Sequence, residues 1–156
     1  MLQNETKRGA GVIKFTVQLT PISKKNSQQI VVNPKTKRPL IMPSKKYKEY
    51  EQAALWYIPK NIYISAPVNV KCLFYMPTHR QSDLTNMLEA IDDIMVKAGL
   101  LADDNFNIVA GHDGSRILYD KENPRTEVYI TPMQEDQIEL KFYGAAIAKA
   151  AANLHK

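Results

Sequence analysis

Residues 82 to 99, SDLTNMLEAIDDIMVKAG, constrain the fold more than any other stretch of the chain. Ser82 is a favourable helix N-cap and Gly99 can end a helix in a left-handed conformation, so the pattern predicts about sixteen helical residues. Projected on a helix, the apolar side chains fall on one arc, formed by Leu84, Met87, Leu88, Ile91, Ile94, Met95 and Ala98. We expect this arc to be buried.

Strand-like segments lie on both sides of this helix. Residues 68–76, VNVKCLFYM, are rich in β-branched and aromatic side chains. Residues 12–19 alternate, so that one face of a strand would carry Ile13, Phe15, Val17 and Leu19. After the helix, FNIVAG, SRILY and RTEVYIT are separated by the turn-forming GHDG and DKENP, and they predict two or three further strands.

A second helix is predicted to begin at the N-cap Ser44 and to stop before Pro59, because proline disfavours a continuing helix. Its core-facing stripe comprises Tyr47, Tyr50, Ala54, Tyr57 and Ile58. Residues 30–32 and 39–42, joined by NPKTKR, predict a hairpin with a basic tip. The expected fold class is therefore α/β of the α+β kind, a small mixed β-sheet packed with two main helices.

The chain of 156 residues, 44% of them apolar, fits one compact domain. We expect a flexible lead-in over residues 1–11, a folded domain over 12–132 and a helical C-terminal extension over 133–156. A dimer contact, a partner contact and a frayed end are all open roles for that extension. The sequence has no signal-peptide start and no long apolar run, so we expect a cytoplasmic protein with no membrane partner. Cys72 is expected to be a reduced core residue.

Charge is unevenly placed in a chain whose net charge is +5. Residues 1–60 carry twelve Lys or Arg against three Glu, whereas residues 82–105 carry six acids against one lysine. A basic half suits a polyanion such as nucleic acid, although such a half is often only a solvated face.

The predicted helix gathers polar groups along one edge. That edge carries Asp83, Asn86, Ala90, Asp93 and Lys97, with Glu89 beside them, while Thr85 and Asp92 point further round. An acid in the first helical turn often does no more than complement the helix dipole.

The adjacent Asp103 and Asp104 make the wider pattern more informative. Fixed carboxylates repel one another, and Mg²⁺, which prefers oxygen ligands and keeps several waters, would offset that repulsion. A cation held by carboxylates within a basic surface suits phosphodiester hydrolysis. From the residues alone, a metal-dependent nuclease is the leading hypothesis.

These residues resemble the signature of the RusA-type Holliday junction resolvases, which has a D-x-D-N-L start, a helix, and an acidic pair after its glycine. The matching segments are Asp83-Leu84-Thr85-Asn86-Met87, Asp93, Lys97-Ala98-Gly99 and Asp103-Asp104. The loop Pro21-Ile22-Ser23-Lys24-Lys25-Asn26-Ser27 resembles the family's proline-serine-asparagine segment. Together the similarity covers residues 12 to 132.

The resemblance implies a homodimeric endodeoxyribonuclease that cuts four-way DNA junctions in recombination and repair, with Mg²⁺ or Mn²⁺ as cofactor. Family members are common in phages and prophages. Carried over by position, Asp83 and Asp104 would be catalytic and metal-binding, with Asp103 as an acidic neighbour. Thr85, Asn86, Asp93 and Lys97 would be supporting residues.

Two positions depart from the family pattern. The middle aspartate of the family is Thr85 here, and a lysine one turn later is Glu89. We hypothesise that the acidic role has moved from position 85 to Glu89, which would then join the catalytic and metal-binding set. An ordinary solvated role for Glu89 is the alternative.

Chain lengths suggest how the distant acids would meet. Sixteen helical residues span about 24 Å, whereas the extended chain from Gly99 to Asp104 returns only about 17 Å. Asp83 and Asp104 of one subunit would therefore barely reach one cation, and an antiparallel dimer that builds each site from two chains solves the problem. A two-fold dimer also suits the symmetry of a four-way junction.

Basic and amide side chains elsewhere are candidates for contacts with the DNA backbone. They are Lys24, Lys25, Asn26, Lys35, Lys37, Arg38, Lys45, Lys46, Arg80 and Arg116. Two alternatives to the nuclease remain open. One is a catalytically impaired dimer that binds junctions, and the other is a general nucleic-acid-binding domain whose acidic helix is merely solvated.

Overall fold

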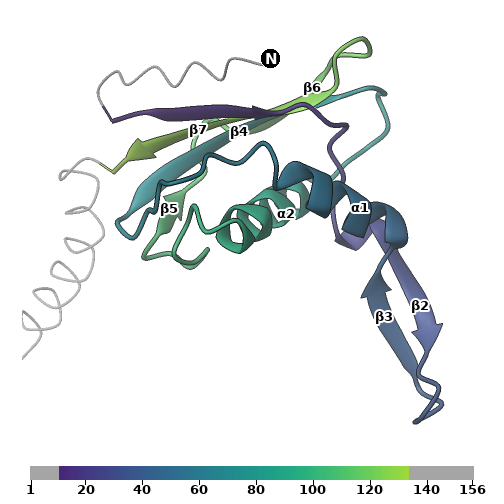
Figure 1. The fold of residues 1–156 in the computed structure, drawn as a ribbon. Coiled ribbons are helices and arrows are strands. Elements are labelled where there is room, and N and C mark those ends of the chain that lie inside the picture. The colour runs from purple at the N-terminus through teal and green to yellow at the C-terminus, as the bar shows by residue number, and fades with distance from the viewer. Residues whose placement is uncertain (1–10, 134–156) are drawn as a thin grey trace, which may run out of the picture.

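The structure, a computed structural model, describes residues 11–133, which form a mixed sheet with two helices on one side of it (Figure 1). The strands of the sheet are β1 (Ile13–Val17), β4 (Val68–Met76), β5 (Val109–Gly111), β6 (Arg116–Tyr119) and β7 (Arg125–Pro132). The helices are α1 (Lys45–Ala54) and α2 (Leu84–Lys97). The predicted α+β class is confirmed.

Strand β4 organises the sheet. It pairs antiparallel with β7 along one edge and parallel with β5 and β6 along the other, and β1 pairs antiparallel with β7. Parallel neighbours need a long crossover connection, and α2 supplies it between β4 and the two short strands β5 and β6. The helix that carries Glu89, Asp92 and Asp93 is therefore tied by the chain to the central strand.

Helix α2 buries one face in the apolar core, as its periodicity predicted. Met87, Ile91, Ile94 and Met95 are buried, and the three other members of the predicted arc are partly buried against the same core. The alternate residues of β4 are buried as well, among them Cys72, whose thiol is free. The buried face of α2 extends further than predicted, because Ala90 and Asp92 also belong to it.

Helix α1 ends earlier than the sequence indicated. The regular helix stops at Ala54, and the chain continues through two tighter turns in which Trp56 and Tyr57 donate to the carbonyl three residues before them. Tyr47, Tyr50, Ala54 and Ile58 are buried as expected, and Tyr57 packs against the core. The predicted stripe therefore faces the core, although Tyr57 and Ile58 lie in the turns that follow the helix.

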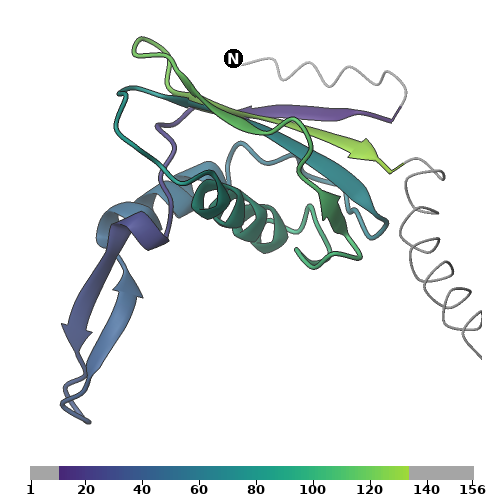
Figure 2. The ribbon, with the colours of Figure 1, turned by 180° about the vertical axis from the view of Figure 1, so that it is seen from behind.

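The predicted hairpin is present, and it stands apart from the sheet. Strands β2 (Gln28–Val32) and β3 (Pro39–Pro43) pair only with each other and project from the body beyond the start of α1 (Figures 1 and 2). Their cross-strand pair of Ile30 and Ile41 is exposed, at 74% and 68%. At the tip, the side chain of Asn33 accepts from two backbone N–H groups, and Lys37 adopts a left-handed conformation.

Two expectations fall on residues outside this description, namely the lead-in at the N-terminus and the helical extension beyond residue 133. Within residues 11–133, none of the helices is long and apolar enough to cross a membrane.

Gly99, which closes α2, provides a test of the helix end. Its φ is +78°, and nothing lies within 4 Å of the position that a Cβ would take. Gly99→Ala should therefore lower the free energy of unfolding by about 1–2 kcal/mol through backbone strain alone. Gly99→Asn should cost less, because Asn visits the left-handed region more readily. Urea unfolding measures the free energy of unfolding of both variants. Equal losses in the two would contradict the attribution of the loss to strain at a left-handed backbone position.

Candidate active site

The polar edge of α2 is paired with charged side chains from other elements. Three ion pairs follow one another at four-residue spacing along the helix. They join Lys25 Nζ to Glu89 Oε2 at 2.8 Å, Lys24 Nζ to Asp93 Oδ2 at 3.4 Å, and Lys97 Nζ to Glu51 Oε2 at 2.5 Å. In two of these pairs, lysines expected to contact DNA thus neutralise acids of the predicted site, namely Glu89 of the catalytic set and the supporting residue Asp93.

The loop between β1 and β2 brings both lysines to the helix. Pro21 and Ser23 are buried, and the short helix η1 (Lys25–Ser27) then turns the chain toward β2. The hydrogen bond and charge of Glu89 raise the pKa of Lys25, and the charge of Asp83 adds to this effect. The Lys25 ammonium is therefore within electrostatic range of Asp83 as well as bonded to Glu89.

Asp83 is the N-cap of α2, in place of the predicted Ser82. Its backbone is extended, and its side chain accepts a 2.9 Å hydrogen bond from the N–H of Thr85. This bond satisfies one of the N–H groups that have no partner within the helix. One carboxylate oxygen of the first candidate catalytic residue is thus engaged in capping, and Thr85 takes part through its backbone.

Asp103 and Asp104 lie in the loop that follows α2 and behave as a pair. Asp103 accepts from the N–H of Asp104 at 2.8 Å and from the Asn105 amide at 2.6 Å, and these bonds lower the pKa of Asp103. Partial burial, the contact with Asp103 and the charge of Asp93 raise the pKa of Asp104. Asp104 therefore sits where negative charge has accumulated and where added positive charge would be stabilising.

The buried Asp92 and the partly buried His112 form a pair at the other border of the apolar face of α2. His112 Nε2 lies 2.8 Å from Asp92 Oδ2, and His112 Nδ1 lies 2.7 Å from the Val70 carbonyl oxygen. Because both ring nitrogens face acceptors, the geometry favours the imidazolium form. The pair links the middle of α2 to the central strand.

The pKa values of this pair follow from burial and mutual contact. Burial raises the pKa of Asp92 more than the hydrogen bond and charge of His112 lower it, and the carboxylate of Asp104 raises it further. Burial alone would lower the pKa of His112, but the hydrogen bond and charge of Asp92 and the bond to Val70 raise it above 6.5.

Asp92 and His112 were not singled out from the sequence. Asp92 borders the apolar arc next to Leu88, and that position was the available signal for burial. The partner could not be found in this way, since His112 reaches Asp92 only through the crossover between β4 and β5.

The acids have the right chemistry for a hard divalent cation, but one chain does not assemble them. Carboxylate oxygens suit Mg²⁺ and Mn²⁺. Among residues 11–133, however, no group of three or more His, Cys, Asp or Glu side chains lies close enough to hold a metal ion. In the same part of the chain Asp92 Oδ1 is buried without a hydrogen-bond partner. This oxygen lies within the electrostatic range of Asp104 and is available to a further donor or cation, while the other oxygen of the same carboxylate bonds His112.

The remaining predicted residues are distributed over several surfaces. Asn86 is partly buried on α2, and Arg116 is exposed at the start of β6. Asn26 lies in η1. The hairpin tip holds Lys35, Lys37 and Arg38, all exposed, while Lys45, Lys46 and Arg80 are exposed around the N-terminal ends of the helices.

The family model described as Endodeoxyribonuclease RusA matches residues 13–131. This range runs from the first residue of β1 into the last strand, β7, and it contains α2 and both candidate acids of the following loop. The resemblance inferred from the motifs is confirmed. A search of curated proteins found no match.

The Asp92–His112 pair predicts a pH dependence of stability. Because the pKa of His112 is raised on folding, its stabilising contribution is complete below 6.5 and is lost as the pH rises through the folded-state pKa. The free energy of unfolding should therefore fall over this window in the native chain and change less in His112→Gln. Urea unfolding at a series of pH values measures this, with His79→Gln as the exposed histidine control. Parallel profiles for the native chain and His112→Gln would contradict the prediction.

Proposed function

Because the chain belongs to the RusA family of endodeoxyribonucleases, we propose that it cuts four-way DNA junctions by metal-dependent hydrolysis of the phosphodiester backbone. Cleavage of this kind serves DNA recombination and repair. The proposal goes beyond family membership in three respects, namely the branched substrate, the cation and the arrangement of the site.

The surroundings of Asp104 give this proposal its main structural support. Desolvation, the contact with Asp103 and the charge of Asp93 raise the pKa of Asp104, and the Asp92 oxygen without a partner lies within the electrostatic range of Asp104. On α2 itself, in contrast, Glu89 and Asp93 each have a lysine partner. Asp103 and Asp104, beyond the C-terminal end of the helix, have no Lys, Arg or His partner among the described residues.

Asp103 and Asp104 would hold Mg²⁺ or Mn²⁺ together with Asp83. When bound, such an ion supplies Lewis-acid stabilisation of charge on the phosphate and lowers the pKa of a coordinated water. The chain's own contribution includes holding the Asp103 carboxylate in place through the Asp104 N–H and the Asn105 amide. Its exposed lysines and arginines bind the flanking phosphates, which supplies affinity without sequence readout.

The site would be built from two copies of the chain. One copy does not bring three candidate ligands together, and α2 separates Asp83, at its start, from the Asp103–Asp104 loop beyond its end. In a two-fold dimer with antiparallel helices, Asp83 of each copy would complete the site of the other. Such a dimer carries two equivalent sites, one for each of the symmetric strands of a junction.

Glu89 is available to a cation only under one condition. Its carboxylate bonds Lys25, so it would enter the site only if a cation displaced that ammonium. If the acidic role of the family's middle aspartate has moved to Glu89, Glu89→Gln should weaken Mn²⁺ binding as Asp83→Asn does. Loss of binding in Asp83→Asn alone would remove the relocation hypothesis.

A junction-binding dimer without cleavage is the second candidate. Two observations favour it, since position 85 has no carboxylate and Glu89 is neutralised by Lys25. Cleavage of a synthetic junction with and without Mg²⁺ or Mn²⁺ separates the two candidates. A preference for junction over linear duplex separates both from a general nucleic-acid-binding domain.

Asp104→Asn should lower the rate of junction cleavage by at least about 100-fold, because it removes a carboxylate proposed to hold the cation. Junction affinity measured without divalent cation should be retained, since the change removes negative charge. Glu122→Gln, which removes an exposed carboxylate from the turn between β6 and β7, is the matched control. Full cleavage by Asp104→Asn would exclude the proposed role.

Mixing two inactive variants tests whether the site spans two chains. In a mixed dimer of Asp83→Asn and Asp104→Asn, one composite site carries both substitutions and the other carries neither. An equal mixture, after subunit exchange, should therefore recover about a quarter of the native strand-nicking activity. No recovery, despite demonstrated exchange of subunits, would place each site within one chain.

A further inference from the structure

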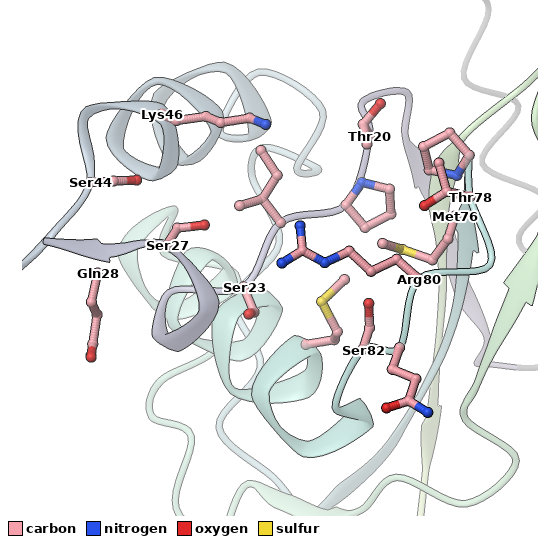
Figure 3. Close-up of a pocket in the computed structure, with 15 residues that line it drawn as sticks. Thr20, Ser23, Ser27, Gln28, Ser44, Lys46, Met76, Thr78, Arg80 and Ser82 are labelled. Carbon is pink, nitrogen blue, oxygen red and sulfur yellow. The ribbon is translucent and has the colours of Figure 1, made fainter.

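A pocket of about 650 Å³ lies beside the start of α2 (Figure 3). Its walls come from four parts of the chain that are distant in sequence. They are the loop after β1, the junction between η1 and β2, the start of α1, and the segment from the end of β4 to α2. A pocket of this volume lies in the range of small-molecule sites and exceeds the need of a lone phosphate group.

The charge of this pocket suits an anion. Arg80 and Lys46 line it, and none of the lining residues is acidic. Figure 3 shows the Arg80 guanidinium extending across the pocket toward Ser23 and Ser27, with Lys46 reaching in from α1. Hydroxyl groups from six serine and threonine residues share the lining. Guanidinium, ammonium and hydroxyl groups together are the usual donors to phosphate oxygens.

The other part of the lining is apolar. Pro21, Ile22, Met76, Pro77 and Met87 contribute to it. Methionine and proline side chains offer flat or adaptable surfaces that can contact an aromatic ring, and sulfur–aromatic contacts are favourable. The pocket therefore combines donors for a phosphate with a surface for a planar base.

The position of the pocket connects it to the candidate catalytic acids. Residues 76–78 and 80–82 line it, and the next residue along the chain is Asp83, the N-cap of α2. A ligand held by Arg80 would thus lie close to the first of the proposed metal-binding carboxylates.

We propose that this pocket receives one unpaired nucleotide of the bound DNA strand, with its phosphate between Arg80 and Lys46 and its base against the apolar wall. A base in a continuous duplex is stacked on both faces, and to enter the pocket it must leave the stack, which costs stacking and pairing free energy. The cost is smaller where stacking is already interrupted, as at the branch point of a junction. The pocket then selects branched over linear DNA. This inference rests on the proposed function only for the identity of the ligand as DNA.

The test uses the full chain, without divalent cation, and a four-way junction that carries 2-aminopurine at its branch point. The fluorescence of 2-aminopurine is quenched within a base stack and rises when the base leaves the stack. Native protein should raise the fluorescence at the branch point and should leave the same base in a linear duplex quenched. Arg80→Gln and Lys46→Gln should abolish most of the rise at saturating protein and weaken junction binding by about 10-fold.

Lys48→Gln is the matched control, because it removes the same charge from the same helix at an exposed position that does not line the pocket. This variant should keep the full fluorescence rise. Arg80 and Lys46 are both exposed, so their variants are expected to fold, and urea unfolding checks this.

Three results would overturn the inference. They are an undiminished rise in Arg80→Gln, an equal loss in Lys48→Gln, and Arg80-dependent binding without any rise, which would mean that only a backbone phosphate occupies the pocket. Failure of the proposed function is a different result. An Arg80-dependent rise without cleavage in Mg²⁺ or Mn²⁺ would support the nucleotide pocket and contradict the nuclease activity. Cleavage together with an Arg80-independent rise would support the nuclease activity and contradict the nucleotide pocket.

Discussion

The burial of one face of α2 beneath the sheet is the constraint on which the other features depend. Ile91, Ile94 and Met95 are almost fully buried in the apolar cluster. Each such side chain contributes about 1.5–3 kcal/mol, and exposed ion pairs contribute far less. The apolar face therefore decides the rotation of the helix. Once that rotation is set, one edge meets His112 and the central strand, and the other meets the lysines of the β1–β2 loop.

Local patterns were sufficient to predict most of the fold. The strand over residues 68–76, the isolated hairpin and the apolar arc of α2 each depend on periodicity or turn residues within a short window. Helix ends were less predictable, because Ser82 and Asp83 are both good caps and only the surrounding chain decides between them. The early end of α1 has a similar origin, since the apolar stripe continues through turns that keep Ile58 buried.

The sequence allowed a candidate site to be proposed by residue type, whereas the contacts of its residues could not be predicted. The acids and the basic loop were visible in the sequence, together with their family pattern. Their pairing was not visible, because Lys24 and Lys25 meet Asp93 and Glu89 only after the loop folds back across α2. The same holds for the Asp92–His112 pair, which joins residues twenty positions apart through a crossover. These contacts pair three acids of α2 with basic side chains, whereas Asp103 and Asp104 have no such partner in the part of the chain that the structure describes.

The arm formed by β2 and β3 has a consequence for how the chain behaves in solution. Its Ile30 and Ile41 side chains project into water, and each strand has one edge that no described residue pairs with through a backbone ladder. Unpaired edges beside apolar side chains are templates for unwanted strand addition. The three cations at the tip, Lys35, Lys37 and Arg38, act against this through mutual repulsion between arms. Since salt screens that repulsion, colloidal stability of the purified chain should depend more on ionic strength than its folding does.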